Sequence, residues 1–110
     1  MFPIWEFIIF NRVMWIISRK TLSDFWKNYK DAEQALRAWY QEAEAASWKK
    51  PSDIKKLYRN ASILKNSRVV FNIAGNKYRL VVKINYDYFM VYIRFIGTHE
   101  QYDKIDANTI

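Results

Sequence analysis

Residues 68–84 have the sequence RVVFNIAGNKYRLVVKI, in which apolar and polar side chains alternate on either side of Gly75-Asn76. Alternation with a period of two indicates β-strands. A Gly-Asn pair between two such runs is typical of a two-residue hairpin turn. This turn predicts three cross-strand pairs: Arg68 with Lys83, Val70 with Val81, and Asn72 with Arg79.

A second hairpin is predicted around Asp87-Tyr88, because residues 89–96 alternate in the same way and Gly97 then ends the run. It predicts three further pairs: Lys83 with Tyr92, Val81 with Arg94, and Arg79 with Ile96. Since side chains alternate across a strand, one face of the three strands is apolar and should form the core. That face comprises Phe71, Leu80, Val82, Ile84, Val91, Ile93 and Phe95.

The first half of the chain has helical spacing. Apolar residues recur at three- and four-residue intervals, which predicts helices over 19–29, 32–46 and, starting at Pro51, 51–58. Asp31 is the predicted N-cap of the second helix. A short strand is expected over 14–17 and a final helical turn over 99–105. The fold class is therefore α+β, with N-terminal helices packed on one face of a small antiparallel β-sheet and a short C-terminal helix.

A chain of 110 residues is expected to form one domain, here residues 14–110. Residues 1–13 are a separate apolar extension. They are too few to cross a bilayer, and Arg12 follows the apolar run instead of preceding it, as it would in a secretory signal. They add a strand or short helix, precede a second start at Met14, or, as a weaker alternative, anchor the chain to a membrane.

The net charge of +7 is unevenly distributed. Residues 49–83 contain ten Lys or Arg and one acidic residue, so this segment carries +9 and the remainder of the chain −2. Such clustering favours a polyanionic partner over a merely solubilising surface. The chain has no cysteine and one histidine, which excludes disulfides, thiolate sites and His-rich metal sites. We therefore expect no metal and no cofactor.

The outer face of the strands gathers cations around a tyrosine. It holds Arg68, Asn72, Arg79, Lys83, Tyr92 and Arg94. Arginine forks bind phosphate oxygens in pairs and tyrosine stacks on unpaired bases, so this face fits single-stranded RNA. An ordinary solvated basic face explains the same pattern. His99 follows the third strand near this surface. Histidine suits proton transfer near neutral pH, although a lone histidine is more often structural.

Five segments in order resemble the HigB toxin family, the branch of RelE-like toxins with an FN-x-x-GN-x-YR-L, YIR and TH-x-x-YD pattern. They are 17–22 (ISRKTL), 48–51 (WKKP), 70–80 (VFNIAGNKYRL), 91–94 (VYIR) and 97–105 (GTHEQYDKI). The match covers nearly all of the chain from about Met14 onward. No single motif is specific, but their combination and order are.

The resemblance implies a RelE-like fold and a metal-independent endoribonuclease, the toxin of a type II toxin–antitoxin system. Such an enzyme, an mRNA interferase, cleaves mRNA on the ribosome by attack of the RNA 2′-OH on the adjacent phosphate. A HigA-like helix-turn-helix antitoxin is implied as partner, and operator DNA would be bound only through the toxin–antitoxin complex. The expected location is the cytoplasm.

Applied to this sequence, the resemblance predicts a catalytic group comprising Arg79, Arg94, His99 and Tyr102. Arg79 and Arg94 would stabilise charge on the phosphate, and His99 or Tyr102 would move protons. The predicted RNA-binding residues are Arg68, Asn72, Lys77, Lys83, Tyr92 and Lys104. Asp103 either contacts RNA with Tyr102 or braces the last turn by pairing with Arg94 or Lys104.

Two other functions fit the same residues. A non-catalytic module could bind RNA or DNA with the basic face, and salt-dependent binding alone would not separate it from a nuclease. A protein-interaction domain could receive an acidic segment in a basic groove without any nuclease activity.

Overall fold

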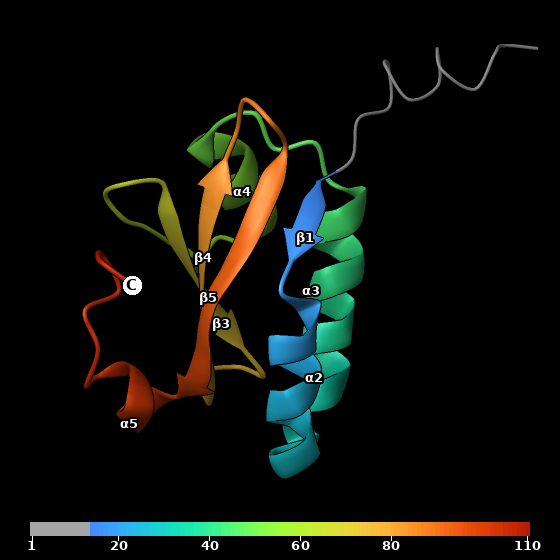
Figure 1. Cartoon of the computed structure of the whole chain (residues 1–110), viewed down its shortest axis with the longest axis vertical. Helices are drawn as coiled ribbons and strands as arrows, with labels where there is room; N and C mark the ends of the chain where they lie inside the picture. The colour runs from blue at the N-terminus through green and yellow to red at the C-terminus, as the bar shows by residue number, and fades with distance from the viewer. Residues whose placement is uncertain (1–13) are drawn as a thin grey trace, which may run out of the picture.

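The computed structural model describes residues 14–110, so the predictions for residues 1–13 lie outside the described part of the chain. One short strand and a run of helices come first, and a meander of strands with a short final helix follows (Figure 1). The elements are β1 (Trp15–Ile17), α2 (Arg19–Asn28), the 3₁₀ turn η1 (Lys30–Ala32), α3 (Glu33–Ala45), α4 (Pro51–Leu57), β2 (Ser62–Ile63), β3 (Arg68–Ile73), β4 (Tyr78–Asn85), β5 (Met90–Thr98) and α5 (His99–Tyr102). The predicted α+β class is confirmed.

The five strands form one sheet in the order β1-β5-β4-β3-β2. Strands β3, β4 and β5 pair antiparallel, as expected. Strand β2, which the sequence analysis did not predict, also pairs antiparallel with β3, but β1 runs parallel to β5. The sheet is therefore mixed, and the prediction of a purely antiparallel sheet is wrong at this edge. Periodicity shows that a segment is a strand but not which strand it will join, because that choice depends on the path of the chain between them.

The register of the first hairpin is confirmed: Arg68 pairs with Lys83, Val70 with Val81 and Asn72 with Arg79. In the turn, Ala74 and Gly75 both have positive φ, and the amide of Lys77 donates to the carbonyl of Ala74. Gly75 adopts this backbone without a Cβ penalty, which is why the turn forms here.

The second hairpin departs from the prediction part-way along. Lys83 pairs with Tyr92 as expected, but a β-bulge between Val81 and Val82 shifts the rest by one residue. Val81 therefore pairs with Phe95 instead of Arg94, and Arg79 with Gly97 instead of Ile96. A bulge places two residues of one strand opposite one residue of the other, so the alternation of faces changes beyond it.

The inner face of the sheet packs against α2 and α3 (Figure 1). Its centre is Phe71, whose ring contacts those of Trp39, Trp48 and Tyr58. Leu36 of α3 is completely buried in the same cluster. Complete burial of such a side chain contributes roughly 1.5–3 kcal/mol, so the helices are held mainly by their apolar stripe. The predicted core face is confirmed here except for Phe95.

A second, smaller apolar cluster lies on the outer face. Val70, Val81 and Ala107 are buried in it, and the partly buried side chains against them are Leu64, Phe95, Tyr102, Ile105 and Ile110. The bulge turns Phe95 to this face, while Ile96 packs with the main core. The chain after β5 therefore folds back over part of the outer face, and only the remainder is open.

A side chain at Gly97 would force two neighbouring side chains to move. A Cβ at this position would lie 2.5 Å from Cζ of Phe95 and 2.7 Å from Oε1 of Gln101. We expect Gly97→Ala to lower the free energy of unfolding by about 1–3 kcal/mol, as overpacking usually does. Urea denaturation would measure this loss. The double variant Gly97→Ala with Phe95→Leu should be less destabilised than the two single losses added together, and simple additivity would contradict the proposed clash.

Candidate nucleic-acid interface

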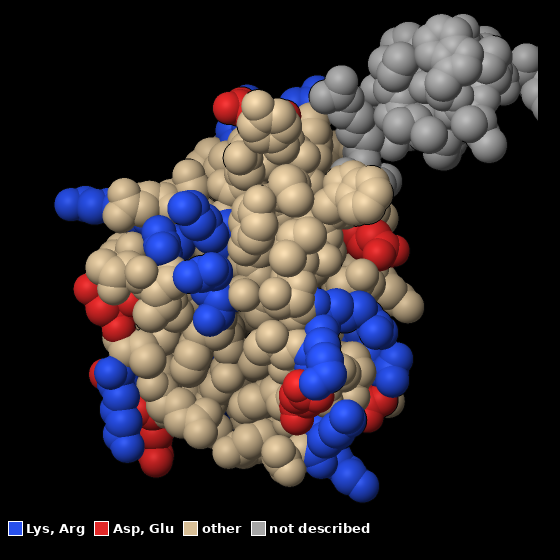
Figure 2. Space-filling view, in the orientation of Figure 1, with Lys and Arg blue, Asp and Glu red and all other residues tan. Residues whose placement is uncertain are grey.

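The open part of the outer sheet face contains a shallow hollow of about 270 Å³. Lys83 and Asn85 of β4 and Tyr92 and Arg94 of β5 line it. Lys83 and Tyr92 are direct cross-strand partners, which fixes their side chains next to each other on one face. In Figure 2, basic side chains gather beside β5 on the side away from α2 and α3.

The β-bulge brings Arg94 to this hollow. Ile93 pairs with Val82 and Phe95 with Val81, so Arg94 is the residue without a partner of its own in β4. Because the strand bends there, the consecutive residues Arg94 and Phe95 both lie on the outer face. Arg94 lines the hollow, and Phe95 packs against the second apolar cluster. Arg94 therefore lies on the outer face as predicted, but it does so because of the bulge and not because of regular alternation.

Arg79 and Asn72 lie farther along the same face. The half-buried Arg79 donates from Nη1 to the carbonyls of Asn76 and Tyr78, at 3.0 and 3.3 Å. Asn72 donates to the carbonyl of Asn60 at 3.4 Å and lines a separate hollow of about 290 Å³ with Arg59. Neither residue lines the hollow of Lys83, Tyr92 and Arg94.

Arg68 lies on the predicted face, but its side chain is engaged with the protein. It is only 9 % exposed, and its guanidinium donates to the backbone oxygens of Asn66, Thr109 and Ile110. The bond to Ile110 is the shortest, at 2.6 Å. Arg68 thus holds residues 109–110 at the edge of the second cluster. To contact RNA as predicted, its guanidinium would have to break these hydrogen bonds and form new ones to phosphate.

Lys77 projects toward the helices. Its ammonium lies 2.9 Å from Oδ2 of Asp31, and the hydroxyl of Tyr78 donates to Oδ1 of the same carboxylate. Asp31 is therefore not the predicted N-cap: α3 begins at Glu33, and Asp31 lies within η1 and joins it to β4. The two donors lower the pKa of Asp31, and the shared proton raises the pKa of Tyr78 to about 12.

The depressed pKa of Asp31 predicts a pH-dependent contribution to stability. Its folded pKa lies below the unfolded value, so the contribution is complete above about pH 5, where the unfolded carboxyl is also ionised, and is lost as pH falls through the folded pKa. Asp31→Asn should therefore have a lower melting temperature than the unchanged chain at pH 7, and the gap should narrow as pH falls below about 5 and close in acid. Asp87→Asn, an exposed turn residue, serves as the control. A gap that stays constant with pH would contradict this assignment.

His99 begins α5 and interacts within its own turn. Its Nδ1 lies 3.0 Å from Oδ2 of Asp103, and both side chains are exposed. Asp103 thus braces the last turn through His99 and not through Arg94 or Lys104 as expected. The brace leaves Nε2 of the ring free of any such bond among residues 14–110. Thr98 and Gln101 form a capping box that holds the start of α5.

Tyr102 and Lys104 follow on the same side. Tyr102 is half-buried, with its ring centroid 6.5 Å from that of Phe95, and Lys104 is exposed. Tyr102 therefore lies between the second cluster and solvent.

The predicted residues form two groups and not one. His99 follows Tyr92 by seven positions, which is roughly 20 Å along a strand. Lys83, Tyr92 and Arg94 share the hollow at one end; Arg79, His99 and Tyr102 lie toward the other end, beside α5. Asn85 is a lining residue that the sequence analysis missed. Its place on the same face two residues after Lys83 was the available signal.

Comparison with known protein families shows the family to which the chain belongs. Residues 32–105, well over half of the chain, match the family model HigB_toxin, described as a RelE-like toxic component of a toxin–antitoxin system. This chain belongs to the HigB toxin family. The matched segment runs from η1 to the residues just after α5, so it includes both groups of the outer face.

Curated relatives of this HigB-family chain agree with that match. The mRNA interferase toxin HigB of Escherichia coli K12 is 29 % identical over 96 residues, which cover 86 % of this chain and 92 % of the relative. The mRNA interferase HigB of Shigella flexneri has the same identity and coverage. That of Escherichia coli O6:H1 is 24 % identical over 94 residues, covering 84 % and 91 %.

Within residues 14–110, no helix combines the length and apolar character needed to span a bilayer. The same residues contain no group of three or more His, Cys, Asp or Glu side chains placed to hold a metal ion.

Proposed function

We propose that this HigB-family chain is an endoribonuclease that cleaves mRNA on the ribosome. The names of its relatives, mRNA interferases, support this activity. The observation that carries the proposal is the hollow in which Lys83, Tyr92 and Arg94 meet on the open sheet face. Two cations beside an aromatic ring suit a phosphate with an unstacked base next to it.

The proposed reaction is an internal transesterification. The 2′-oxygen of a ribose forms a bond to the adjacent phosphorus, and the bond from phosphorus to the 5′-oxygen of the next nucleotide breaks. A base accepts the proton of the 2′-OH, and an acid protonates the leaving 5′-oxygen. The products are a 2′,3′-cyclic phosphate and a 5′-OH, and no metal enters the balance.

In this mechanism Arg94 and Lys83 stabilise the charge that develops on the phosphate, and Tyr92 stacks on a base. Arg79, His99 and Tyr102 lie toward the α5 end of the face, so the proposal requires the scissile phosphate to lie between the two groups, with Arg94 on one side and Arg79, His99 and Tyr102 on the other. The bond from Nδ1 of His99 to Asp103 orients the ring and favours proton transfer at Nε2. Asn72, Lys77 and Lys104 are proposed to contact flanking phosphates, and so is Arg68 if its bonds to residues 109–110 open.

The finer partners are also proposals. We infer that a HigA-like helix-turn-helix antitoxin restrains this chain in the cytoplasm, and that their complex binds operator DNA through the antitoxin. Membership of a toxin–antitoxin family supports the presence of an antitoxin. Its class follows only from the resemblance to HigB proteins.

Cleavage of mRNA by the purified full chain, with and without ribosomes and in the presence of EDTA, tests the proposal. We expect fragments that end in a cyclic phosphate, formed without added metal. Binding of RNA without cleavage under both conditions would overturn the nuclease and favour a non-catalytic binding module. Cleavage only with added Mg²⁺ would overturn the mechanism.

A further inference from the structure

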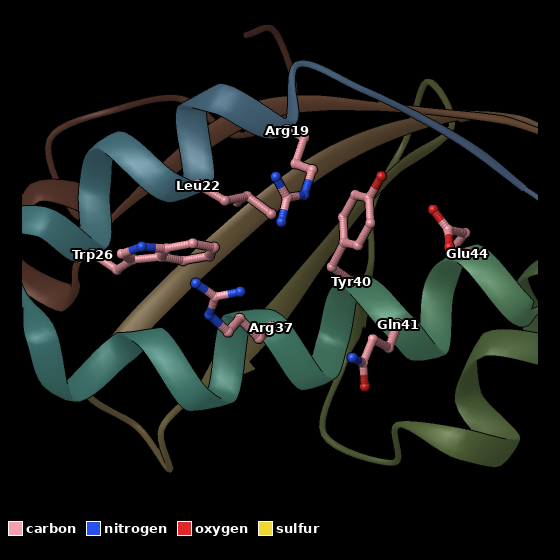
Figure 3. A pocket seen from close by; sticks show the side chains of 7 residues that line it. All are labelled: Arg19, Leu22, Trp26, Arg37, Tyr40, Gln41 and Glu44. Atoms are coloured by element: carbon pink, nitrogen blue, oxygen red, sulfur yellow. The ribbon is translucent and has the colours of Figure 1, made fainter.

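A groove of about 220 Å³ lies between α2 and α3, on the opposite side of the sheet from the hollow. In Figure 3, the guanidinium groups of Arg19 from α2 and Arg37 from α3 both extend into the space between the two helices. The proposed reaction on the outer sheet face uses neither residue. Two guanidinium groups that converge from separate helices form a strong donor site for an anion.

Aromatic rings hold both cations in place. Cζ of Arg19 lies 5.0 Å from the ring centroid of Tyr40, and Cζ of Arg37 lies 4.7 Å from that of Trp26. The N–H groups of a guanidinium lie in the plane of the guanidinium. A guanidinium that stacks on an aromatic ring can therefore still donate hydrogen bonds from its edge. Arg37 also pairs with Glu33 at 2.8 Å, whereas Arg19 has no carboxylate within ion-pair distance among residues 14–110.

The rest of the groove indicates what kind of anion it receives. Its floor is apolar, because Leu22 is completely buried and Trp26 is 8 % exposed. Glu44 lines one end, beside the Tyr40 hydroxyl, and burial together with Glu44 raises the pKa of that tyrosine. Glu33 and Glu44 would repel a continuous phosphate backbone. A protein segment with one carboxylate and a neighbouring apolar side chain complements both the charges and the floor.

We propose that this groove is the docking site of the antitoxin, and that it receives an Asp or Glu side chain of that protein between Arg19 and Arg37. An apolar neighbour of this carboxylate would lie on Trp26 and Leu22. The inference relies on membership of a toxin–antitoxin family and on the antitoxin partner of the proposed function, but not on RNA cleavage. Because the groove and the hollow are on opposite sides of the sheet, separate substitutions can test them.

Arg19→Glu tests the site in the full chain, with the purified HigA-like antitoxin of the proposed pair as the probe. We expect binding by calorimetry to weaken roughly 30-fold, as it does when an arginine central to an interface is lost. Lys30→Glu is the matched control: it makes the same charge change at an exposed residue outside the groove and should alter binding less than threefold. RNA cleavage by Arg19→Glu should equal that of the unchanged chain.

A charge swap distinguishes docking from a structural effect. If Arg19→Glu weakens binding through the proposed pair, one antitoxin variant with an acidic residue changed to Arg should restore it. Arg37→Gln should also weaken binding if Arg19→Glu does not fold. Unchanged binding in both variants would overturn the proposal, and so would weakening that no antitoxin variant restores. Loss of ribosome binding with intact antitoxin binding would identify an RNA surface instead. Absent RNA cleavage in the unchanged chain would refute the nuclease alone.

Discussion

Arg94→Ala is expected to slow RNA cleavage by about 100-fold or more while leaving the fold intact. Its guanidinium lines the hollow beside Lys83 and Tyr92, and its side chain is exposed. Loss of one well-placed donor to a developing phosphate charge costs about this much in rate. Arg94→Lys, which keeps the charge but not the planar fork, should fall between the two. Single-turnover cleavage of a short RNA would measure the effect.

The control for Arg94→Ala is Lys20→Ala, which removes one exposed cation from α2 on the other side of the sheet. It should change the cleavage rate less than threefold. Lys83→Ala should lower kcat more than it raises KM, because Lys83 is proposed to stabilise the charge that develops on the scissile phosphate. Full activity of Arg94→Ala would remove the hollow from the mechanism. His99→Gln would then show whether the α5 end of the face carries the reaction.

Phe71→Ala is expected to lower the free energy of unfolding by about 3–5 kcal/mol, the usual cost of removing a buried aromatic ring. The ring is 1 % exposed and contacts those of Trp39, Trp48 and Tyr58. Three helical or loop segments therefore lose their common contact with β3. For a chain with the marginal stability of ordinary domains, this loss would leave a measurable unfolded fraction at 37 °C. Urea titration followed by tryptophan fluorescence would measure it.

Tyr88→Ala is the matched control, since it also replaces an aromatic residue by alanine but at a side chain that is 72 % exposed in the β4–β5 turn. It should change stability by less than about 0.5 kcal/mol. Equal losses in the two variants would show that the cluster around Phe71 is not the centre of the core.

Local patterns predicted the helices, three long strands and the first hairpin. Helical spacing placed α2, α3 and α4 to within one residue of their observed ends, since an amphipathic stripe is a property of the segment itself. Gly75-Asn76 determined the pairing of β3 with β4, because a short turn leaves one register in which both apolar faces coincide.

The bulge could not be predicted from alternation. Both Arg94 and Phe95 fit a regular strand, and only the cover supplied by Tyr102, Ile105 and Ala107 makes the outer side of β5 a good place for the Phe95 ring. The same cover converts Arg68 from a predicted surface cation into a buried tie to residues 109–110. Both outcomes depend on residues that are distant in sequence.

The sequence by itself determined which residues share a face up to the bulge, the α+β class, and the placement of Lys83 beside Tyr92, because these follow from side-chain periodicity and two short turns. Tertiary structure decided the parallel edge strand, the separation of His99 from the hollow, and the convergence of Arg19 with Arg37. These features depend on how segments that are far apart in the sequence pack against each other. The local pattern of a segment does not specify its distance from another segment or their relative direction.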